Sequence, residues 1–167
     1  MTDRTPAAVC RRLTAGVYVI GVAHGGRANA FTAAWVTQVS FDPLLVALSV
    51  NPSNASYPLL TGSGVFVVNV LRAGQQDLAR RFGTRSGRDD DKLREVRWRA
   101  GVGGSPILEH AAAYLACRVV TTVPAGDHVV VIAEVTGGEV LDPSAVPLRY
   151  DETGTMDGSD ALYPRAF

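Results

Sequence analysis

The segment NAFTAAWVTQVSFDP, residues 29–43, places small residues, hydroxyls and an amide on an extended chain between two apolar strands. Thr32, Ala33 and Ala34 carry only small side chains, so backbone N–H and C=O groups there can approach the polar edge of a planar ligand. The alternative is that Ala33 and Ala34 are small core residues packed against a neighbouring helix. Trp35 has the same two interpretations, because an indole can wall a ring pocket or fill the core.

The sequence on either side of this segment predicts a mainly β fold. The apolar run Leu44 to Val50 follows directly and is typical of a strand covered on both faces. Residues 17–23 are rich in β-branched side chains and precede turn residues, which predicts a hairpin leading into residue 29. Further strands are expected at residues 65–70, 114–123 and 128–141, and short helices at residues 7–14, 56–60 and 75–82.

The order of these elements favours one fold class. Strands and helices do not alternate regularly, so an antiparallel β-barrel of Greek-key type with a few short flanking helices is favoured over a doubly wound sheet. The two longest β segments are joined at residues 124–127 and predict a second hairpin.

The composition is that of one ordinary globular domain. The chain has 167 residues, 47% hydrophobic and 19% charged, which is enough for one well-buried core. We expect residues 1–167 to form a single domain, with residues 147–167 as a C-terminal tail that either wraps across the body or a partner subunit or is loose.

Charge and hydropathy indicate which partners to expect. The 16 basic and 16 acidic residues cancel, so no charge field argues for a nucleic acid or an anionic membrane as partner. No apolar run approaches the roughly 20 residues that a spanning helix needs, and the N-terminus has no apolar signal core, which predicts a soluble cytoplasmic protein.

The cysteines and histidines favour no metal site. Cys10 and Cys117 lie far apart, in an expected helix and an expected buried strand, and are predicted to be buried thiols; a disulfide, a redox pair or a metal site is the alternative. His24, His110 and His128 show no spacing typical of metal ligands.

Two polar clusters have the chemistry to hold phosphate. The first follows a strand and precedes a helix, where hydroxyls and helix-start N–H groups bind phosphate oxygens or simply cap the helix. The second ends the next helix, where cations bind phosphate or balance the helix dipole. The first cluster is Asn51, Ser53, Asn54 and Ser56, and the second is Arg80, Arg81 and Arg85.

Two further polar segments have both a functional and an ordinary interpretation. Asp127-His128 opens a strand, where the histidine either bonds a cofactor or substrate or is an exposed turn residue. The charged residues 84–97 form a solvated loop or, alternatively, a mobile lid.

Four blocks, taken in order, resemble the flavin reductase-like family with the FMN-binding split-barrel fold. They are RLTAGV at 12–17; FTA at 31–33 continuing to VSFDP at 39–43; FVVNVL at 66–71 with QDLARRF at 76–82; and CRV at 117–119 followed by GDH at 126–128 and EV at 134–135. Their order and spacing, rather than any single motif, make the resemblance specific, and they span about residues 8–140.

The resemblance implies a homodimer of split barrels that binds FMN or FAD near the interface, with NAD(P)H as co-substrate. It also implies roles for individual residues at matching positions. These are Thr32, Ala33, Ala34 and the adjoining Trp35 at the isoalloxazine ring, Asn51, Ser53 and Ser56 at the ribityl and phosphate groups, Arg81 and Arg85 facing the phosphate, and His128 orienting the nicotinamide.

The chain departs from the family pattern at one point, and this leaves two functions open. Many members have Thr-Ala-Asn-Ser where this chain has Thr32-Ala33-Ala34-Trp35, and the WVxQxSFxP version resembles the domains joined to flavodiiron proteins. The first function is an NAD(P)H-dependent flavin reductase that transfers hydride to FMN or FAD and supplies a monooxygenase or another acceptor. The alternative is a flavin-binding electron-transfer or carrier protein with tightly held FMN and little NAD(P)H activity of its own.

Overall fold

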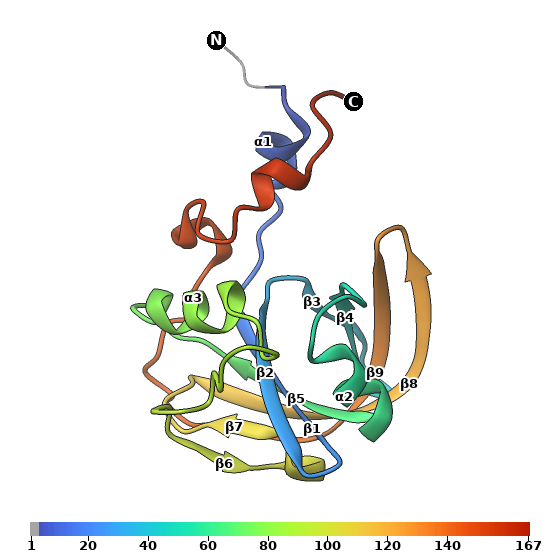
Figure 1. Cartoon of the computed structure of the whole chain (residues 1–167), viewed down its shortest axis with the longest axis vertical. Helices are drawn as coiled ribbons and strands as arrows, with labels where there is room; N and C mark the ends of the chain where they lie inside the picture. The colour runs from blue at the N-terminus through green and yellow to red at the C-terminus, as the bar shows by residue number, and fades with distance from the viewer. Residues whose placement is uncertain (1–3) are drawn as a thin grey trace.

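A curled antiparallel sheet forms most of the protein (Figure 1), whose computed structural model describes residues 4–167. Seven strands pair in the order β2-β1-β5-β8-β9-β4-β3. Their bounds are β1 (Tyr18–His24), β2 (Arg27–Ala33), β3 (Val36–Ser40), β4 (Leu45–Val50), β5 (Val65–Val70), β8 (Ala113–Ala125) and β9 (His128–Val140). The remaining regular elements are α1 (Pro6–Cys10), α2 (Tyr57–Ser63), α3 (Gln76–Thr84), β6 (Trp98–Ala100) and β7 (Pro106–Leu108). The mainly β, antiparallel fold with few helices is therefore confirmed.

The two edge strands of the large sheet are consecutive in the chain. Only Ala34 and Trp35 lie between β2 and β3, although these strands stand at opposite ends of the strand order. The sheet must therefore curl until its edges meet at these two residues. Among the described residues no ladder pairs β2 with β3, so the sheet is not closed by hydrogen bonds.

The predicted hairpins are present, whereas residues 29–43 do not form one extended strand. β1 pairs with β2 from Tyr18↔Ala33 to His24↔Arg27, and β8 pairs with β9 through a turn at Gly126, whose φ of 64° suits glycine. β4 alternates between buried and half-buried positions, so only one of its faces is fully covered rather than both.

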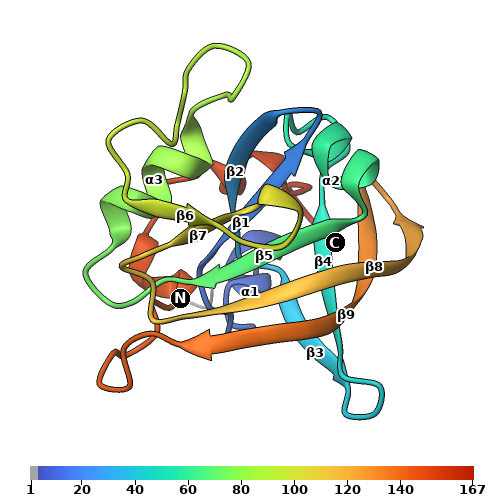
Figure 2. The same ribbon diagram turned by 90° about the horizontal axis from the view of Figure 1, so that it is seen from below.

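The core lies inside the curl of the sheet. Leu60 of α2 is fully buried against side chains from several strands, including Phe66 and Val131. α3 buries Ala79 and Phe82 in a second cluster outside the curl. Figure 2 shows β7 lying against β1 and β5, with β6 paired to β7.

Asn69 joins three of these strands from a fully buried position. Its Nδ2 donates to the carbonyl oxygens of Val19 at 3.0 Å and Pro106 at 3.1 Å, and its Oδ1 accepts from the N–H of Leu108 at 2.7 Å. The amide therefore ties β7 to β5 and β1.

The two ends of the chain pack on each other and stand away from the sheet (Figure 1). α1 ends at Cys10, shorter than the predicted residues 7–14, because the next turn is made by i→i+3 bonds from Arg12 to Val9 and from Leu13 to Cys10. Arg11 forms an ion pair of 2.8 Å with Asp160 of the tail. Among residues 4–167, no helix is long and apolar enough to cross a membrane.

The cysteines are both free thiols. Cys117 is buried as predicted, and burial raises the pKa of its thiol to about 12. Cys10 is only half-buried, because its short helix packs against the tail rather than in the core.

Candidate functional site

A pocket of about 370 Å³ lies at the seam where the chain crosses from β2 to β3. This volume is in the range of roughly 300–1,000 Å³ that small-molecule sites occupy. Its walls come from the crossing itself, the end of β4, the β8–β9 turn and the C-terminal tail. The lining residues are Phe31, Thr32, Ala33, Ala34, Trp35, Ser49, Val50, Asn51, Asn54, Gly83, Asp127, His128, Tyr150, Asp157, Ser159 and Leu162.

At the crossing, the backbone polar groups of one pocket-lining residue lack partners within the described chain. Ala34 belongs to neither strand, and its N–H and C=O form no backbone hydrogen bond with any residue of the described chain. On either side the chain is fixed, because the Thr32 hydroxyl donates to the Ala79 carbonyl at 2.7 Å and the Trp35 carbonyl accepts from the Ser49 N–H at 3.0 Å. A donor and an acceptor are thus held available at a rigid position beside a side chain of one carbon.

Trp35 and His128 form one wall of the pocket. Their ring centroids are 5.0 Å apart with the planes tilted by 56°, and 53% of Trp35 is exposed. The two residues meet because Trp35 adjoins Ser49 of β4 and because Val50 of β4 pairs with Val129 of β9.

The orientation of His128 is set by its neighbour Asp127. His128 Nδ1 lies 2.8 Å from Asp127 Oδ1, and this hydrogen bond is the main cause that lowers the pKa of the aspartate. A carboxylate beside Nδ1 favours the tautomer that carries its proton there, in which Nε2 is an acceptor. Among the described residues, Nε2 has no hydrogen-bond partner.

The C-terminal tail supplies a wall that the sequence did not identify. The Tyr150 hydroxyl donates to Asp157 Oδ2 at 2.7 Å and lies 2.9 Å from Ser159 Oγ, while Asp157 Oδ1 accepts from the Ser159 N–H at 3.0 Å. Burial raises the pKa of Tyr150. Burial also opposes ionisation of Asp157, but the hydrogen bonds from Ser159 and Tyr150 outweigh it and lower the pKa of this carboxyl group.

The remaining predicted residues divide between the pocket and its surroundings. Asn51 lines the pocket, and its Oδ1 accepts from the N–H of Ser53 at 2.9 Å and from the hydroxyl of Ser53 at 2.8 Å. Ser53 itself is exposed outside the lining. Ser56 is fully buried, and its Oγ accepts from Asn29 Nδ2 at 3.0 Å.

Arg81 and Arg85 line a separate hollow with Glu95 and Val96. Arg81 donates from Nε to the Lys92 carbonyl at 2.8 Å, and Arg85 pairs with Asp90 at 3.1 Å. Both guanidinium groups are therefore engaged by the polypeptide. The structure brings together Thr32, Ala33, Ala34, Trp35, Asn51 and His128, and leaves Ser53, Ser56, Arg81 and Arg85 outside the pocket.

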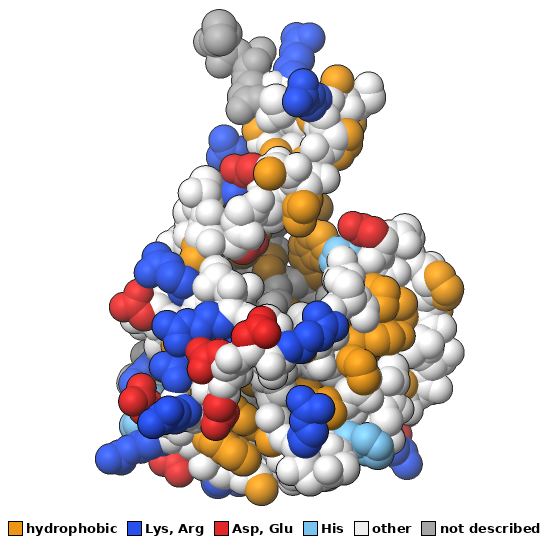
Figure 3. Space-filling model, in the orientation of Figure 1, with side chains coloured by type: hydrophobic (Ala, Val, Ile, Leu, Met, Phe, Trp, Pro, Cys, Tyr) orange, Lys and Arg blue, Asp and Glu red, His pale blue; other side chains and the backbone are white. Residues whose placement is uncertain are grey.

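The charged segment after α3 is anchored at one buried residue. Lys92 is 3% exposed and its Nζ donates to the Phe82 carbonyl at 3.3 Å, while burial lowers its pKa to about 8. Figure 3 shows acidic and basic side chains interleaved over α3 and this segment. Its predicted alternative role as a mobile lid stays a prediction.

Comparison with known proteins identifies related chains. Residues 10–159 match the family model described as the flavin reductase like domain. The FMN reductase (NADH) RutF of Variovorax paradoxus is 41% identical over 124 residues, which cover 74% of this chain and 68% of RutF. Diflavin flavoprotein A 1 of Synechocystis sp. is 35% identical over 130 residues, which cover 77% of this chain and 23% of that protein.

The fold has solved relatives as well. A protein from Mycobacterium thermoresistibile described as nitrilotriacetate monooxygenase component B superposes with a TM-score of 0.77 at 32% identity, covering 84% of this chain and 78% of that one. This chain spans about a quarter of the length of the diflavin flavoproteins, 24% in three of them.

Proposed function

The chain belongs to the flavin reductase-like domain family, and on this premise we propose that it is an NAD(P)H-dependent flavin reductase acting on FMN or FAD. The observation that carries the proposal is Ala34, a residue of the pocket lining whose backbone N–H and C=O are unpartnered in the described chain. The edge of an isoalloxazine ring has alternating donors and acceptors, so this backbone fits it.

The pocket has the shape and chemistry that such a ring needs. Ala33 and Ala34 leave room for a flat group, and Trp35 offers an aromatic wall beside it. When bound, the flavin supplies the redox chemistry, because its ring accepts a hydride from a dihydronicotinamide. The protein contributes position: Thr32, through its bond to Ala79, holds β2 against α3 and keeps the crossing in place.

His128 is the residue proposed to orient the nicotinamide. Its Nε2 acceptor suits the carboxamide N–H₂ of that ring, and Asp127 holds the imidazole in the required tautomer. Hydride transfer needs no general acid or base from the protein, so the contribution of His128 is alignment of the two rings.

Assembly as a homodimer of split barrels in the cytoplasm belongs to the same proposal. The β3–β4 hairpin exposes apolar side chains, with Val39 50%, Phe41 91% and Leu44 41% accessible, which supports a surface covered by a second copy. A monooxygenase or another electron acceptor is the proposed consumer of the reduced flavin.

A second candidate is an electron-transfer or carrier protein that retains its FMN. Large side chains from two separate segments line the pocket, Trp35 from the crossing and Tyr150 with Leu162 from the tail, which supports a retained flavin. The similarity to part of a diflavin flavoprotein favours the same possibility.

The experiment is to mix purified protein with FMN or FAD and to follow NADH and NADPH oxidation by absorbance. The reductase proposal expects oxidation well above a protein-free flavin control. A protein that purifies yellow, with FMN that NAD(P)H does not reduce anaerobically, supports the carrier instead. Failure to bind FMN and FAD at micromolar concentrations contradicts both.

A further inference from the structure

The pocket at the β2–β3 crossing contains no cation that would neutralise a flavin phosphate. Its lining includes the carboxylates of Asp127 and Asp157 but neither lysine nor arginine. A flavin phosphate carries up to two negative charges and is usually bound by an arginine or by several N–H groups. The phosphate of a flavin bound here must therefore lie outside this pocket.

Asn51 and Ser53 lie in sequence from the pocket lining to the protein surface. Asn51 lines the pocket, and Ser53 is bonded to it on the exposed side. The guanidinium of Arg88 reaches the same place, because its Nη2 donates to the Ser53 carbonyl at 3.1 Å. This is the one hydrogen bond of the Arg88 side chain within the described chain, so most of its donors remain available.

The other arginines of this region are already engaged. Arg81 is bonded to the carbonyl groups of Lys92 and Arg94, and Arg85 is paired with Asp90. Each would have to break an existing interaction to hold a phosphate, and neither adjoins Ser53. Arg88 therefore has the geometry that the family resemblance assigned to Arg81 and Arg85.

A second hollow begins at Arg88. It has a volume of about 760 Å³ and lies between the start of β2, with Arg27 and Ala28, and the segment that runs from Gly87 to Arg94, with Trp98 behind. Gly87 packs directly on β2, because a Cβ there would lie 2.0 Å from Asn29 Nδ2. Position 87 therefore leaves no room for a side chain between this segment and Asn29.

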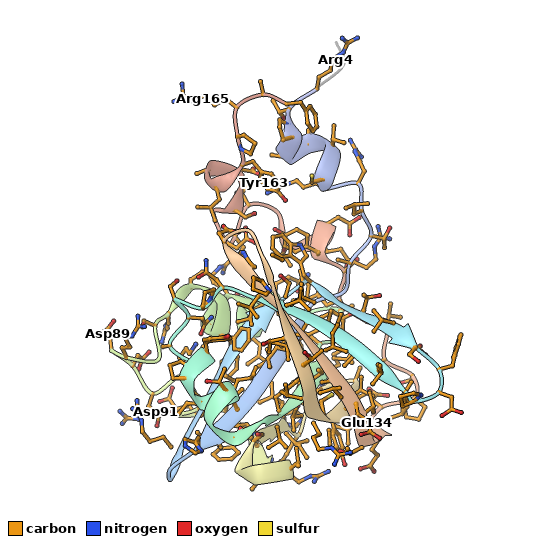
Figure 4. All side chains as sticks on the ribbon, turned by 90° about the vertical axis from the view of Figure 1, so that its right-hand side faces the viewer. Arg4, Asp89, Asp91, Glu134, Tyr163 and Arg165 are labelled. Atoms are coloured by element: carbon orange, nitrogen blue, oxygen red, sulfur yellow. The ribbon has the colours of Figure 1, made fainter. Side chains whose placement is uncertain are left out.

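The charges around this hollow suit an anionic nucleotide. Arg27, Arg88 and Arg94 line it, whereas Asp90 is occupied by Arg85. Asp89 and Asp91 also belong to the lining: Asp91 Oδ1 accepts from the Leu93 N–H at 3.1 Å, and Figure 4 shows Asp89 at the outer edge of the loop. The lining therefore offers three guanidinium groups and an indole, which are groups that bind phosphate and stack on a base.

We propose that Arg88 binds the flavin phosphate beside Ser53 and that the hollow beyond it receives the adenosine monophosphate half of FAD. This inference rests on the proposed flavin site and deepens it by naming FAD as the preferred flavin. Riboflavin would use only the first pocket, FMN would add Arg88, and FAD would add the second hollow.

The three flavins test each part separately. Binding of riboflavin, FMN and FAD is measured by quenching of flavin fluorescence at one fixed ionic strength. In the unchanged protein we expect FAD to bind several-fold more tightly than FMN. Arg88→Ala should raise the Kd of FMN and FAD about tenfold or more and leave riboflavin within about twofold, because a charge-assisted hydrogen bond is lost. Arg80→Ala removes an exposed arginine that pairs with Asp77 and lines neither cavity, so it is the control and should change none of the three.

The second hollow has its own variant. Ala28→Phe fills it from an exposed position of β2 and should raise the Kd of FAD about tenfold while FMN stays within about twofold. Ala100→Phe, on an exposed position of β6, is the control for adding the same side chain to a strand. Far-ultraviolet circular dichroism and urea unfolding show that each variant is folded.

The outcomes separate this inference from the proposed function. Equal loss of riboflavin and FMN in Arg88→Ala, FAD binding no tighter than FMN, or equal loss of FMN and FAD in Ala28→Phe overturns the inference while leaving flavin reduction intact. Failure of all three flavins to bind the unchanged protein, with no NAD(P)H oxidation, overturns the proposed function itself.

Discussion

Replacing Ser56 by alanine should destabilise the protein and weaken riboflavin and FMN binding by the same factor. The reason is that Ser56 supports the site from inside the protein rather than touching a ligand. It is fully buried, its Oγ accepts from Asn29 Nδ2 at 3.0 Å, and its own N–H donates to Asn54 Oδ1 at 2.9 Å. Asn54 lines the pocket, so a shift of this turn changes the pocket for every flavin.

The magnitude follows from what Ser56→Ala leaves behind. Asn29 is 8% exposed, so its amide loses its only hydrogen-bond acceptor within the described chain and finds little water in its place. An orphaned buried donor of this kind costs about 1–3 kcal/mol of unfolding free energy. With a urea m-value of about 2 kcal/mol per molar, the unfolding midpoint should fall by roughly 0.5–1.5 M.

Urea unfolding followed by circular dichroism, together with riboflavin and FMN titrations, checks the expectation for Ser56. Ser53→Ala, at an exposed position of the same turn, should leave the unfolding midpoint within about 0.3 M. The double variant Asn29→Leu with Ser56→Ala should regain part of the lost stability, because neither polar partner then remains. A variant of normal stability that loses FMN but keeps riboflavin would refute the reasoning and make Ser56 a phosphate ligand.

Three other changes test the fold and the site. Asn69→Leu should lower the free energy of unfolding by about 3–5 kcal/mol, because the buried Leu108 N–H and Pro106 carbonyl lose their hydrogen-bond partner. Urea titration measures this change, and a decrease below about 1 kcal/mol contradicts the expectation. Burial lowers the pKa of Lys92 from 10.5 to about 8. Between these two pH values the unfolded state keeps the ammonium proton and the folded state has lost it. The free energy of unfolding should therefore rise as the pH increases from about 8 to 10.5. The rise is about 1 kcal/mol after solvent screening, and Lys92→Met should remove that part of the slope in parallel unfolding titrations. His128→Asn should lower kcat/KM for NADH about tenfold and leave the Kd of FMN within about threefold of its value in the unchanged protein. If the Kd of FMN rises as much as kcat/KM falls, His128 contacts the flavin rather than the nicotinamide.

The hairpins were predictable because their signals are local. Runs of β-branched residues separated by glycine-containing turns predict β1–β2 and β8–β9, and both are present. The break between β2 and β3 was not predicted, because Ala34 and Trp35 differ little in β-propensity from their neighbours. What ends each strand there is the loss of a pairing partner, which depends on the whole sheet.

The polar clusters were harder to interpret for a related reason. A serine between a strand and a helix has the same local pattern whether it caps the helix, binds phosphate or satisfies a buried amide, and only the position of Asn29, 27 residues earlier, identifies the last role for Ser56. The tail residues Tyr150 and Asp157 reach the pocket through contacts that no local pattern encodes. The sequence does not distinguish Arg88 from the other arginines of its charged segment. Its hydrogen bond to the Ser53 carbonyl, which only the fold reveals, does so.

The position of the candidate site follows from the topology of the sheet. A curled sheet whose edge strands are consecutive must carry its chain across the seam, and the residues of the crossing leave one ladder before they enter the other. Ala34 occupies that interval, so its backbone groups lack the partners that strands provide. Unsatisfied backbone at a seam is costly unless water or a ligand supplies the missing hydrogen bonds, and a methyl side chain keeps it accessible. The feature that leaves the sheet unclosed is therefore the same feature on which the proposed binding of a flavin ring edge rests.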